Sequence, residues 1–434
     1  MSEATSSQMA PGSRAGFVFV GVLAFATVVS FIHRYVPAVL VDGIRADLAI
    51  SDVQFSFLQS AFALTYAAAT LASGWVADRT NRRNLIVAGI ALWTVGSFLF
   101  GLADSLNGLL VARIMVGMGE AVLSPAGISL LCDYVGSERR GRAIALVYFG
   151  ATLGGSLAFS GGGLMLDLAA AGHFTGLPFV GGLEGWRQVV LLLSALGLLL
   201  IPLMLAFPEP KRSFDIHAAD KGRLLDLWRS RRILWLVFLS GSSVAVADFA
   251  YTSWQTAFLT RSFDLTAGVA GQSLGLTALL AGTVGAWVGG ILSDRARVRG
   301  GVAARIGVVR WCAVGLLASA SLLLVPQASF GMAAYAGWQF VANIAYVACA
   351  VTLQDLVTDR TRALAASMSI CLSIGLGLGF GPTAVAALNQ GIGGGENALG
   401  PSLLITLVAM GLLTLLFATM LERRLRREGG AGPV

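Results

Sequence analysis

The chain has 434 residues, of which 56% are hydrophobic and only 12% are charged. Soluble domains carry about 25% charged residues, so this composition excludes a soluble globular protein and indicates a membrane protein. The formal net charge of +7 would suit a nucleic-acid partner, but the basic residues lie in short connections between apolar runs. Membrane orientation explains such a distribution better, so we expect no nucleic-acid partner.

Twelve apolar runs are long enough to cross a bilayer, which requires about 20 residues per helix. They cover residues 16–40, 54–77, 84–103, 107–132, 143–166, 187–206, 233–257, 267–293, 304–324, 331–356, 363–388 and 400–421. The first run exceeds the core of a signal peptide, which has ~7 to 15 residues, and it lacks an A-x-A cleavage site, so we expect it to be retained. The sequence predicts an all-α membrane protein with twelve transmembrane helices.

A polar connection over residues 208–232 divides these runs into two groups of six. Within it, RLLDLWRSRR predicts a short amphipathic helix on the lipid surface. GWVADR at 74–79 recurs as GILSDR at 290–295, and RGRA at 140–143 recurs as RTRA at 360–363. Secondary transporters are commonly built from two such similar halves around a site near the midplane. We predict a tail (1–15), a first bundle (16–207), a linker (208–232), a second bundle (233–421) and a tail (422–434).

The basic residues predict the orientation of the chain. They gather in both tails and after the second, fourth, sixth, eighth and tenth runs, whereas the other connections hold only Arg45, Arg187 and Arg261. Short cytoplasmic loops carry the excess of Lys and Arg, so both termini are predicted to be cytoplasmic. Lysine occurs only at Lys211 and Lys221. This arginine bias suggests a GC-rich bacterial genome and therefore a bacterial inner membrane.

The sequence offers little for redox, metal or enzymatic chemistry. Its four cysteines, at positions 132, 312, 349 and 371, lie in apolar runs without paired spacing, so we interpret them as small core residues. A membrane enzyme would need a nucleophile, a metal cluster or a suitable His and Asp spacing, and a sensor would usually carry an added soluble domain. We find none of these and expect no enzyme, metal or cofactor.

The stretch GWVADRTNRR resembles the signature of the major facilitator superfamily between its second and third helices. That signature runs G-x-x-x-D-R-x-x-R-R or K, and it matches at Gly74, Asp78, Arg79, Arg82 and Arg83. The resemblance implies two six-helix bundles that rock around a central site. It also implies a conformational gate in which Asp78 accepts hydrogen bonds from the N-terminus of the eleventh helix, where the helix dipole favours anions.

In the implied gate, Arg79 and Arg83 form adjoining ion pairs, and Asp294 with Arg295 is the repeat of the motif in the second half. The alternative interpretation is that the arginines only hold the loop on the cytoplasmic side.

A narrower resemblance is to the spinster-like branch of this superfamily. It is carried by ADRTNRR, by ARIMVGMGEAVLSPAGISLLCDY in the fourth run and by GWRQVV at the start of the sixth. That branch commonly carries N-Y-x-D-R in the first helix, where this chain has SFIHR over residues 30–34. The arginine is kept, but His33 replaces the aspartate. Organic-anion/proton symporters share a similar first helix and GxGEA pattern, so they are the alternative.

Four ionisable residues lie inside the first and fourth runs, namely His33, Arg34, Arg113 and Glu120. Arg113 and Glu120 are seven residues apart, which places them on one helical face about 10 Å apart along the axis. An unpaired charge in a span costs at least a few kcal/mol, so these groups need partners. The first and fourth helices are neighbours in the resembled fold, which implies that His33 and Arg34 face Glu120 across the central cavity.

We predict that Glu120 is the proton-binding group, because burial favours a neutral carboxyl whereas a nearby arginine favours the carboxylate. Pairing of Glu120 with Arg34 or Arg113 would hold one conformation, and protonation would release it. The alternative is a static salt bridge within the first half. His33 is either a further coupling or substrate-contacting group or a neutral hydrogen-bonding residue.

Polar side chains recur at helical spacing in the second half. They form one stripe on the seventh helix and another on the tenth, comprising Asp248, Tyr251, Thr252 and Gln255, and then Gln339, Asn343 and Tyr346. They are candidate substrate contacts or interhelical hydrogen bonds, and Asp248 is a second candidate proton site. Trp254 and Trp338 either flank an apolar ligand or, as we favour, belong to an interfacial aromatic belt.

Two further features lie in the ninth and eleventh runs. Arg310 is close enough to the cytoplasmic side to reach the headgroups. The stretch SIGLGLGFGP predicts close packing or a bend near Gly379, Gly381 and Pro382.

A cavity that is charged on one side and polar and aromatic on the other suits an amphiphilic or anionic small molecule. The spinster resemblance implies a lysolipid or sphingoid-like substrate, and the symporter resemblance implies a carboxylate bound by Arg34. The fifth run lacks the Gly-Pro pair typical of the superfamily's drug antiporters, which places a drug or metabolite exporter third. We expect a monomer in contact with membrane lipids that moves its substrate together with protons.

Overall fold

The computed structural model describes residues 14–136, 138–210, 232–393 and 398–427. Most of the predicted first tail, residues 428–434 of the predicted second tail, and the predicted amphipathic helix of the linker except for its last residue lie outside the described residues. Within them the protein is all-α, as predicted. Eleven helical segments are long and apolar enough to cross a membrane.

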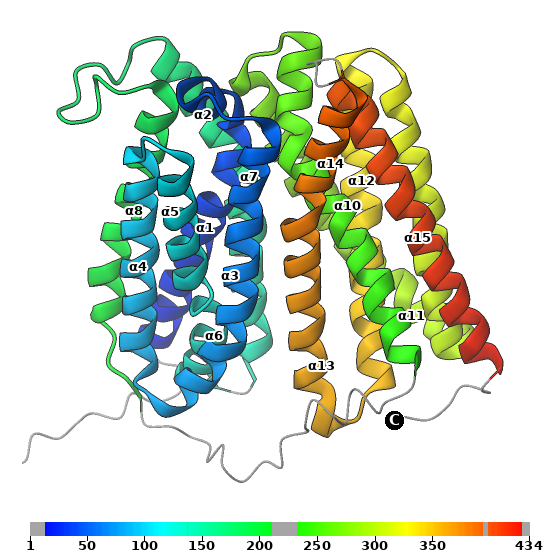
Figure 1. Ribbon diagram of the computed structural model, residues 1–434. Coiled ribbons are helices and arrows are strands. Elements are labelled where there is room, and N and C mark those ends of the chain that lie inside the picture. The colour runs from blue at the N-terminus through cyan, green and yellow to red at the C-terminus, as the bar shows by residue number, and fades with distance from the viewer. Residues whose placement is uncertain (1–13, 137, 211–231, 394–397, 428–434) are drawn as a thin grey trace, which may run out of the picture.

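The first half is a bundle of six spans, drawn in blue to green in Figure 1. Its helices are α1 (Arg14–Val39), α2 (Val41–Leu48), α3 (Asp52–Arg79), α4 (Arg82–Leu102), α5 (Leu106–Glu120), α6 (Leu123–Tyr134), α7 (Arg140–Ala170) and α8 (Gly185–Leu205). The short α2 lies at one end of the bundle, and α5 with α6 forms a single span.

The second half stands beside the first, from green to red in Figure 1. It contains α10 (Arg232–Phe263), α11 (Ala267–Ser321), η2 (Leu322–Leu324), α12 (Ala328–Leu356), α13 (Asp359–Leu372), the π-helical η3 (Ser373–Leu378), α14 (Gly379–Ile392) and α15 (Leu399–Arg427). The eleventh span is built from α13, η3 and α14 together. The domain boundaries given above remain a prediction.

One boundary differs from the sequence prediction. The eighth and ninth runs were expected to be separated by a loop over 294–303, but α11 continues through this region and changes direction at Gly300 and Gly301. Gly301 has a φ of 67°, a left-handed conformation that glycine adopts without steric cost. Two helices of α11 therefore account for the twelfth crossing.

The fourth span is interrupted because of a proline. Pro125 has no backbone N–H, so it cannot donate to the carbonyl of Ala121 one turn earlier. The hydroxyl of Ser73 on α3 donates to that carbonyl instead, at 3.1 Å. Glu120 is consequently the last residue of α5, directly before the interruption.

The glycine-rich stretch of the eleventh span packs closely against α10, as predicted. A Cβ added at Gly381 would lie 2.4 Å from the carbonyl oxygen of Val246, and one at Gly377 would lie 2.6 Å from the ring of Phe249. Gly377 lies within the π-helical η3, and Gly381 lies in α14 directly after it. Small residues here allow two backbones to approach, which is how helices commonly pack in membranes.

The two ends of the molecule differ in how the halves meet. We call the end where α8 finishes and α10 begins the linker end, and the opposite end the α2 end (Figure 1). At the α2 end Arg261 of α10 forms ion pairs with Asp42 at 2.6 Å and Asp52 at 2.9 Å. Asn389 of α14 also donates to Asp52. These contacts join the halves at the α2 end.

Close packing of α7 against α11 also holds the two halves together at the α2 end. A Cβ added at Gly163 would lie 2.3 Å from the carbonyl oxygen of Ala267, and one at Gly271 would lie 2.2 Å from that of Phe159. The two backbones are therefore too close for any larger residue. The halves are closed against each other on the α2 side of the cavity described next.

Candidate functional site

Arg34 and Glu120 form an ion pair inside the first half. Oε2 of Glu120 accepts hydrogen bonds from Nη2 of Arg34 at 3.0 Å and from Nε at 3.3 Å. The two side chains are only 6% and 0% exposed. The guanidinium also lies 4.4 Å from the centre of the Phe31 ring and 4.5 Å from that of Tyr66, where the ring faces attract a cation. The predicted contact between α1 and α5 is present.

The second oxygen of Glu120 has a different environment. Oε1 is buried and has no hydrogen-bond partner among the described residues. The same carboxyl thus presents one oxygen to an arginine and one oxygen that is free to take up a proton.

Arg113 is held by neutral groups. Its Nη2 donates to Oε1 of Gln59 at 2.8 Å, and its Nη1 donates to the backbone carbonyl of His33 at 3.3 Å. That carbonyl is available because Pro37, four residues later in α1, has no N–H to donate to it. Arg113 therefore links α5 to α1 and α3, and the Glu120 carboxylate binds Arg34.

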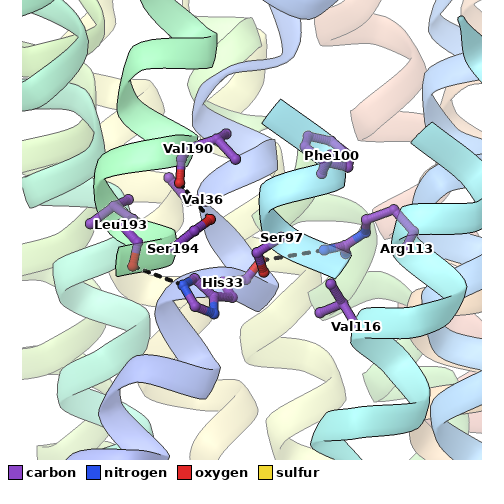
Figure 2. A pocket seen from close by; sticks show the side chains of 9 residues that line it. All are labelled: His33, Val36, Ser97, Phe100, Arg113, Val116, Val190, Leu193 and Ser194. Carbon is purple, nitrogen blue, oxygen red and sulfur yellow. Dashed lines mark hydrogen bonds between the residues drawn. The ribbon is translucent and has the colours of Figure 1, made fainter. Parts of the chain in front are cut away.

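His33 lies elsewhere than expected. Its Nε2–H donates to the carbonyl of Leu193 on α8 at 3.1 Å, as Figure 2 shows, so the ring lies against α8. The expectation that His33 and Arg34 would both face Glu120 was wrong, because consecutive residues of a helix point about 100° apart. Nδ1 is buried without a partner among the described residues. The His33 ring lines a small cavity of about 20 Å³, together with Ser97, Arg113 and Ser194.

A larger cavity lies between the two halves. Its volume is about 420 Å³, and α1, α7, α10, α11 and α12 all contribute to its wall. Its polar and aromatic lining includes Tyr35, Ser156, Asp248, Thr252, Thr283, Tyr335, Gln339, Asn343 and Tyr346, and its apolar lining includes Phe31, Phe159, Ala278 and Ala286. Pockets that hold drug-sized molecules measure roughly 300–1000 Å³, so this cavity is large enough for a substrate.

The cavity extends away from the sealed α2 end. Along α7 its wall runs from Phe159 to Phe149 and Tyr148, towards the start of α7 at the linker end. The side chains of Phe149 and Tyr148 are 47% and 62% exposed. The cavity is therefore closed on the α2 side and reaches exposed side chains on the linker side.

Asp248 is the one charged side chain among the described residues that line this cavity. Its Oδ1 accepts hydrogen bonds from Nε1 of Trp338 and Nε2 of Gln339, both at 3.2 Å. Its Oδ2 accepts from the hydroxyl of Tyr346 at 3.3 Å. The predicted stripes on α10 and α12 thus meet at this carboxylate. Asn343 lines the same cavity beside Gln339 and donates to its carbonyl.

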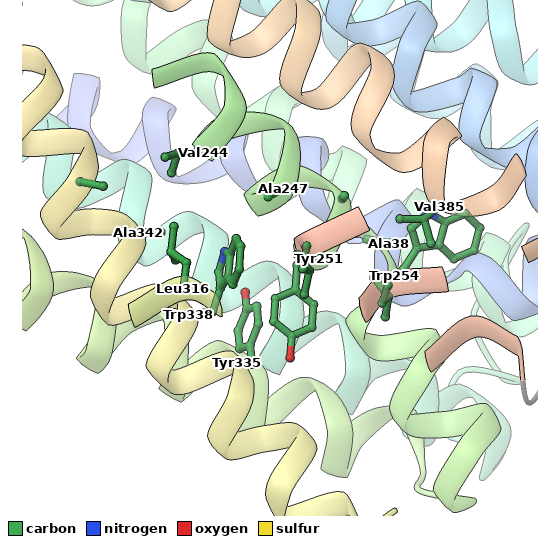
Figure 3. Close-up of a cluster of buried hydrophobic side chains, with 14 of the residues drawn as sticks. Ala38, Val244, Ala247, Tyr251, Trp254, Leu316, Tyr335, Trp338, Ala342 and Val385 are labelled. Carbon is green, nitrogen blue, oxygen red and sulfur yellow. The ribbon is translucent and has the colours of Figure 1, made fainter. Parts of the chain in front are cut away.

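Other predicted contacts do not line the cavity. Tyr251 and Gln255 are fully buried, and Gln255 donates to the carbonyl of Gly331 on α12. Tyr251 packs edge-on against Tyr335 and Trp338, and Figure 3 shows these three rings side by side. These two residues support the cavity wall from behind, whereas Asp248 and Thr252 on the same helix line it.

The aromatic-belt interpretation of the two tryptophans was wrong. Trp254 and Trp338 are both 0% exposed. Nε1 of Trp254 donates to the carbonyl of Pro382 at 2.9 Å, and Nε1 of Trp338 donates to Asp248. Buried indoles need such hydrogen-bond partners, and the partners fix both rings inside the bundle.

The sequence analysis missed Tyr35 and Tyr335, which line the cavity. A signal existed for Tyr335, because it precedes Gln339 by four residues and extends the tenth-helix stripe by one turn. Tyr35 directly follows Arg34 but points to another side of α1. Its neighbours in sequence gave no such periodic signal.

The charged residues at the linker end form a cluster in each half. Arg82 binds Asp133 at 2.6 Å and Glu209 at 2.8 Å, while the backbone N–H of Arg83 donates to Glu209. In the second half, Arg305 binds Asp355 and lies 3.5 Å from Asp294. Each described cluster therefore ties helices of its own half together.

The remaining residues of the motif lie at the end of α3 and along α11. A Cβ at Gly74 would meet no described atom within 4 Å, and the guanidinium of Arg79 lies 4.0 Å from the ring centre of Trp75. Asp78 stands one residue before the end of α3, a helix that packs against α13. Arg295 is exposed. The predicted bond from the first turn of α13 to Asp78 remains a prediction.

Arg310 was expected to reach the lipid headgroups. Instead its Nη1 pairs with Oε2 of Glu422 on α15 at 3.0 Å, and Arg426 binds the other oxygen of that carboxylate. The side chain of Glu422 is 5% exposed. An ion pair between helices thus satisfies this arginine.

Comparison with known proteins identifies the family. A model described as Major Facilitator Superfamily matches residues 23–382. The chain belongs to the Major Facilitator Superfamily. It is therefore a multi-pass membrane transporter and not an enzyme, and its two halves have the fold that the sequence predicted.

Its relatives within the superfamily include an "MFS-type efflux pump" from Mycolicibacterium smegmatis, 25% identical over 432 residues that cover 96% of this chain and 95% of the pump. Protein spinster from Drosophila melanogaster is 24% identical over 404 residues, covering 89% of this chain and 64% of that protein. The resemblance to the spinster-like branch is thereby confirmed as a relationship of sequence.

Among solved structures, a bacterial homologue of the human lysosomal transporter Spinster, in an inward-facing and occupied conformation, superposes with a TM-score of 0.83. The two chains are 24% identical, and the match covers 96% of this chain and 98% of the other. At this identity the likeness shows a shared fold.

Proposed function

We propose that this protein is a secondary active transporter that moves an amphiphilic small molecule across the membrane by alternating access, coupled to protons at Glu120. The observation that carries the proposal is the cavity of about 420 Å³ between the two halves, which is sealed at the α2 end. A site between two bundles, closed on one side, is what a rocking transporter needs. A lysolipid or a sphingoid-like molecule fits this description.

The lining of the cavity favours an amphiphile over a simple carboxylate. A carboxylate substrate was expected to bind Arg34, but Arg34 is engaged by Glu120 and does not line the cavity. Phe31 and Phe159 give part of the wall an apolar character, whereas Asp248 and its neighbours make another part polar. An organic-anion symporter is therefore the weaker alternative.

Proton coupling is proposed from the Arg34–Glu120 pair. In the described state Oε2 of Glu120 binds Arg34, while Oε1 has no described partner and can take up a proton. Protonation would remove the charge that holds Arg34 and so weaken the contact between α1 and α5. His33 lies against α8 and lines the same small cavity as Arg113. We propose it as a further residue of the proton-coupling site.

The two ends of the molecule supply the proposed gates. The contacts of Arg261 with Asp42 and Asp52 would hold the α2 end closed, and the G-x-x-x-D-R motif with Asp78 would do so at the linker end when the halves rock. The distribution of Lys and Arg supports a cytoplasmic linker end. We propose that the protein acts as a monomer in a bacterial inner membrane with both termini in the cytoplasm.

The test is flux into proteoliposomes, first with lysolipids, organic acids and lipophilic drugs in turn, with and without a pH gradient. For the substrate so found, Glu120→Gln should abolish accumulation driven by the gradient while leaving exchange without a gradient. Glu422→Gln is the matched control, since it removes another buried carboxylate of an ion pair far from the cavity. Gradient-driven accumulation by Glu120→Gln at the wild-type rate would refute the proposed coupling.

A second candidate function is export of drugs or metabolites. It is supported by the relative from M. smegmatis, which is named an efflux pump and matches along 96% of this chain. The aromatic lining of the cavity is compatible with it. Inside-out vesicles that take up a drug, and no lysolipid, under an imposed gradient would favour this candidate.

A further inference from the structure

The charge of Asp248 has no described cationic partner, although it stands in the wall of the central cavity. Trp338, Gln339 and Tyr346 all donate hydrogen bonds to it, and all three are neutral. We propose that the cavity binds the cationic head group of its substrate, a protonated amine or a quaternary ammonium, with Asp248 as the counter-ion. The proposal deepens the proposed function and rests on it.

The geometry around Asp248 positions both carboxyl oxygens by hydrogen bonds from neutral side chains. Both oxygens receive donors, at 3.2 Å from Trp338 and Gln339 and at 3.3 Å from Tyr346. An indole N–H can only donate, and the amide nitrogen of Gln339 likewise only donates. Tyr251 packs behind the ring of Trp338 and fixes its position. These neighbours orient the carboxylate but do not neutralise it.

No basic side chain among the described residues lines the cavity. The arginine that comes close is Arg34, whose guanidinium lies 4.4 Å from the centre of the Phe31 ring. That ring lines the cavity, and Arg34 is itself paired with Glu120. The charge of Arg34 is thus compensated within the first half. A net negative charge at Asp248 consequently faces the cavity.

A charge inside a membrane protein is costly unless another charge or many dipoles compensate it. Since the described wall offers no cation, a cation bound within the cavity would supply the compensating charge. An anionic ligand would meet Asp248 with repulsion and would find no described basic group to bind. The electrostatics of the cavity therefore select a cation.

The aromatic side chains of the cavity favour the same class of ligand. Tyr35, Phe159, Tyr335 and Tyr346 line it, and the rings of Tyr35 and Phe159 are 6.0 Å apart. Aromatic faces attract ammonium groups, and quaternary ammonium ligands are typically recognised by several rings. The rings towards the linker side, Tyr148 and Phe149, give that part of the wall an aromatic surface against which an apolar tail could pack. Head group and tail together describe a cationic amphiphile.

Equilibrium binding to the full chain in lipid nanodiscs tests the proposal, with two probes that have the same shape and opposite charge. These are tetraphenylphosphonium and tetraphenylborate, and a third probe, decyltrimethylammonium, carries a smaller head group. We expect at least one cationic probe to bind about tenfold more tightly than tetraphenylborate. Asp248→Asn should weaken that binding about tenfold or more, which is typical for loss of one partner of a desolvated charge pair.

Glu422→Gln serves as the control and should bind the cation as the wild type does, because Glu422 lies outside the cavity and pairs with Arg310. Asp248→Glu, which keeps the charge, should retain the preference for the cation. Equal binding of the two tetraphenyl probes by the wild type would overturn the proposal, and this result does not depend on any variant folding. Unchanged cation binding by Asp248→Asn would also overturn it and would assign Asp248 to protons only.

These outcomes can be told apart from failure of the proposed function, because binding requires no gradient. Cation binding at Asp248 without any gradient-driven flux would remove the proposed coupling and leave the inference intact. Gradient-driven flux of an anion, together with no binding of a cation, would leave the proposed coupling intact and remove the inference about Asp248.

Discussion

Glu120 in the first half is bound by an arginine of the protein itself, whereas Asp248 in the second half is bound only by neutral donors. Glu120 is completely buried, while Asp248 is partly exposed to the central cavity. A carboxylate compensated by its own fold can serve as a switch, because removing its charge frees the arginine. A carboxylate whose charge is compensated only by a bound cationic ligand can serve as a binding site.

The comparison suggests a division of labour. The first half keeps its charges away from the substrate cavity, since Arg34 pairs with Glu120 and Arg113 binds the neutral Gln59. The second half presents its charge to the cavity. Proton binding and substrate binding would then occur on different halves, joined through the contacts of α1 with α10. Four variants test this view, in order of decreasing expected effect.

Removing Arg34 should have the largest effect on stability. Arg34→Ala leaves Glu120 buried without its cation, which typically costs about 3–5 kcal/mol of unfolding free energy. Thermal unfolding in detergent should show a marked loss of folded protein. The double variant Arg34→Met with Glu120→Gln should recover much of it, because no unpaired charge then remains. If the single variant Arg34→Ala is as stable as the wild type, then Arg34 does not stabilise the buried Glu120 carboxylate.

Breaking the contact between the halves should have an intermediate effect. Arg261→Ala removes the pairs with Asp42 and Asp52, and loss of such hydrogen bonds between charged groups costs about 1.5–3 kcal/mol. It should also increase the distances between spin labels placed across the α2 end. Arg187→Ala is the matched control, because its pair with Asp47 lies at the same end within the first half. Equal distance distributions in both variants would mean that Arg261 does not hold the halves together.

Neutralising Asp248 should affect stability little. Asp248→Asn keeps one carbonyl oxygen for Trp338 and Gln339 and loses the acceptor of Tyr346, a change of about 1 kcal/mol. Tyr346→Phe removes the same hydrogen bond and keeps the charge, so thermal shifts of the two variants should agree. A loss of 3 kcal/mol or more in Asp248→Asn alone would reveal a cationic partner within the protein and break the contrast with Glu120.

Replacing His33 should change the pH dependence of transport more than its rate. His33→Asp puts a carboxylate beside Arg113, whereas the wild type has a ring with a reference pKa near 6.5 at that position. We expect the pH optimum of flux to move by about one unit. His33→Asn, which cannot titrate, is the control for the changed shape. A profile identical to that of the wild type would remove His33 from the coupling machinery.

Much of the fold followed from apolar periodicity and length. Twelve runs of about 20 residues, with a polar break in the middle, are sufficient to predict two six-helix bundles. The loop expected between the eighth and ninth runs was too long: helix extends from both sides up to Gly300 and Gly301, whose non-helical backbone angles make the break. Polarity alone did not reveal this.

The site was predicted in part. Charged residues inside apolar runs were predicted to need partners of opposite charge. Arg34 and Glu120 do form such an ion pair. Which face of α1 each residue takes was not predictable, and so His33 was placed wrongly. The tryptophans were also misplaced, because an indole at the interface and one with a buried acceptor look the same in a sequence.

By itself the sequence determined that this protein crosses the membrane in two similar halves and carries ionisable groups that cannot remain unpaired there. Composition and spacing decide these matters because a polar group exposed to the hydrocarbon is costly whatever its position in the chain. Only the tertiary structure decided which carboxylate binds an arginine and which faces the cavity. Partners such as Arg34 and Glu120 are 86 residues apart, and helix rotation, which depends on packing against several neighbours at once, selects them.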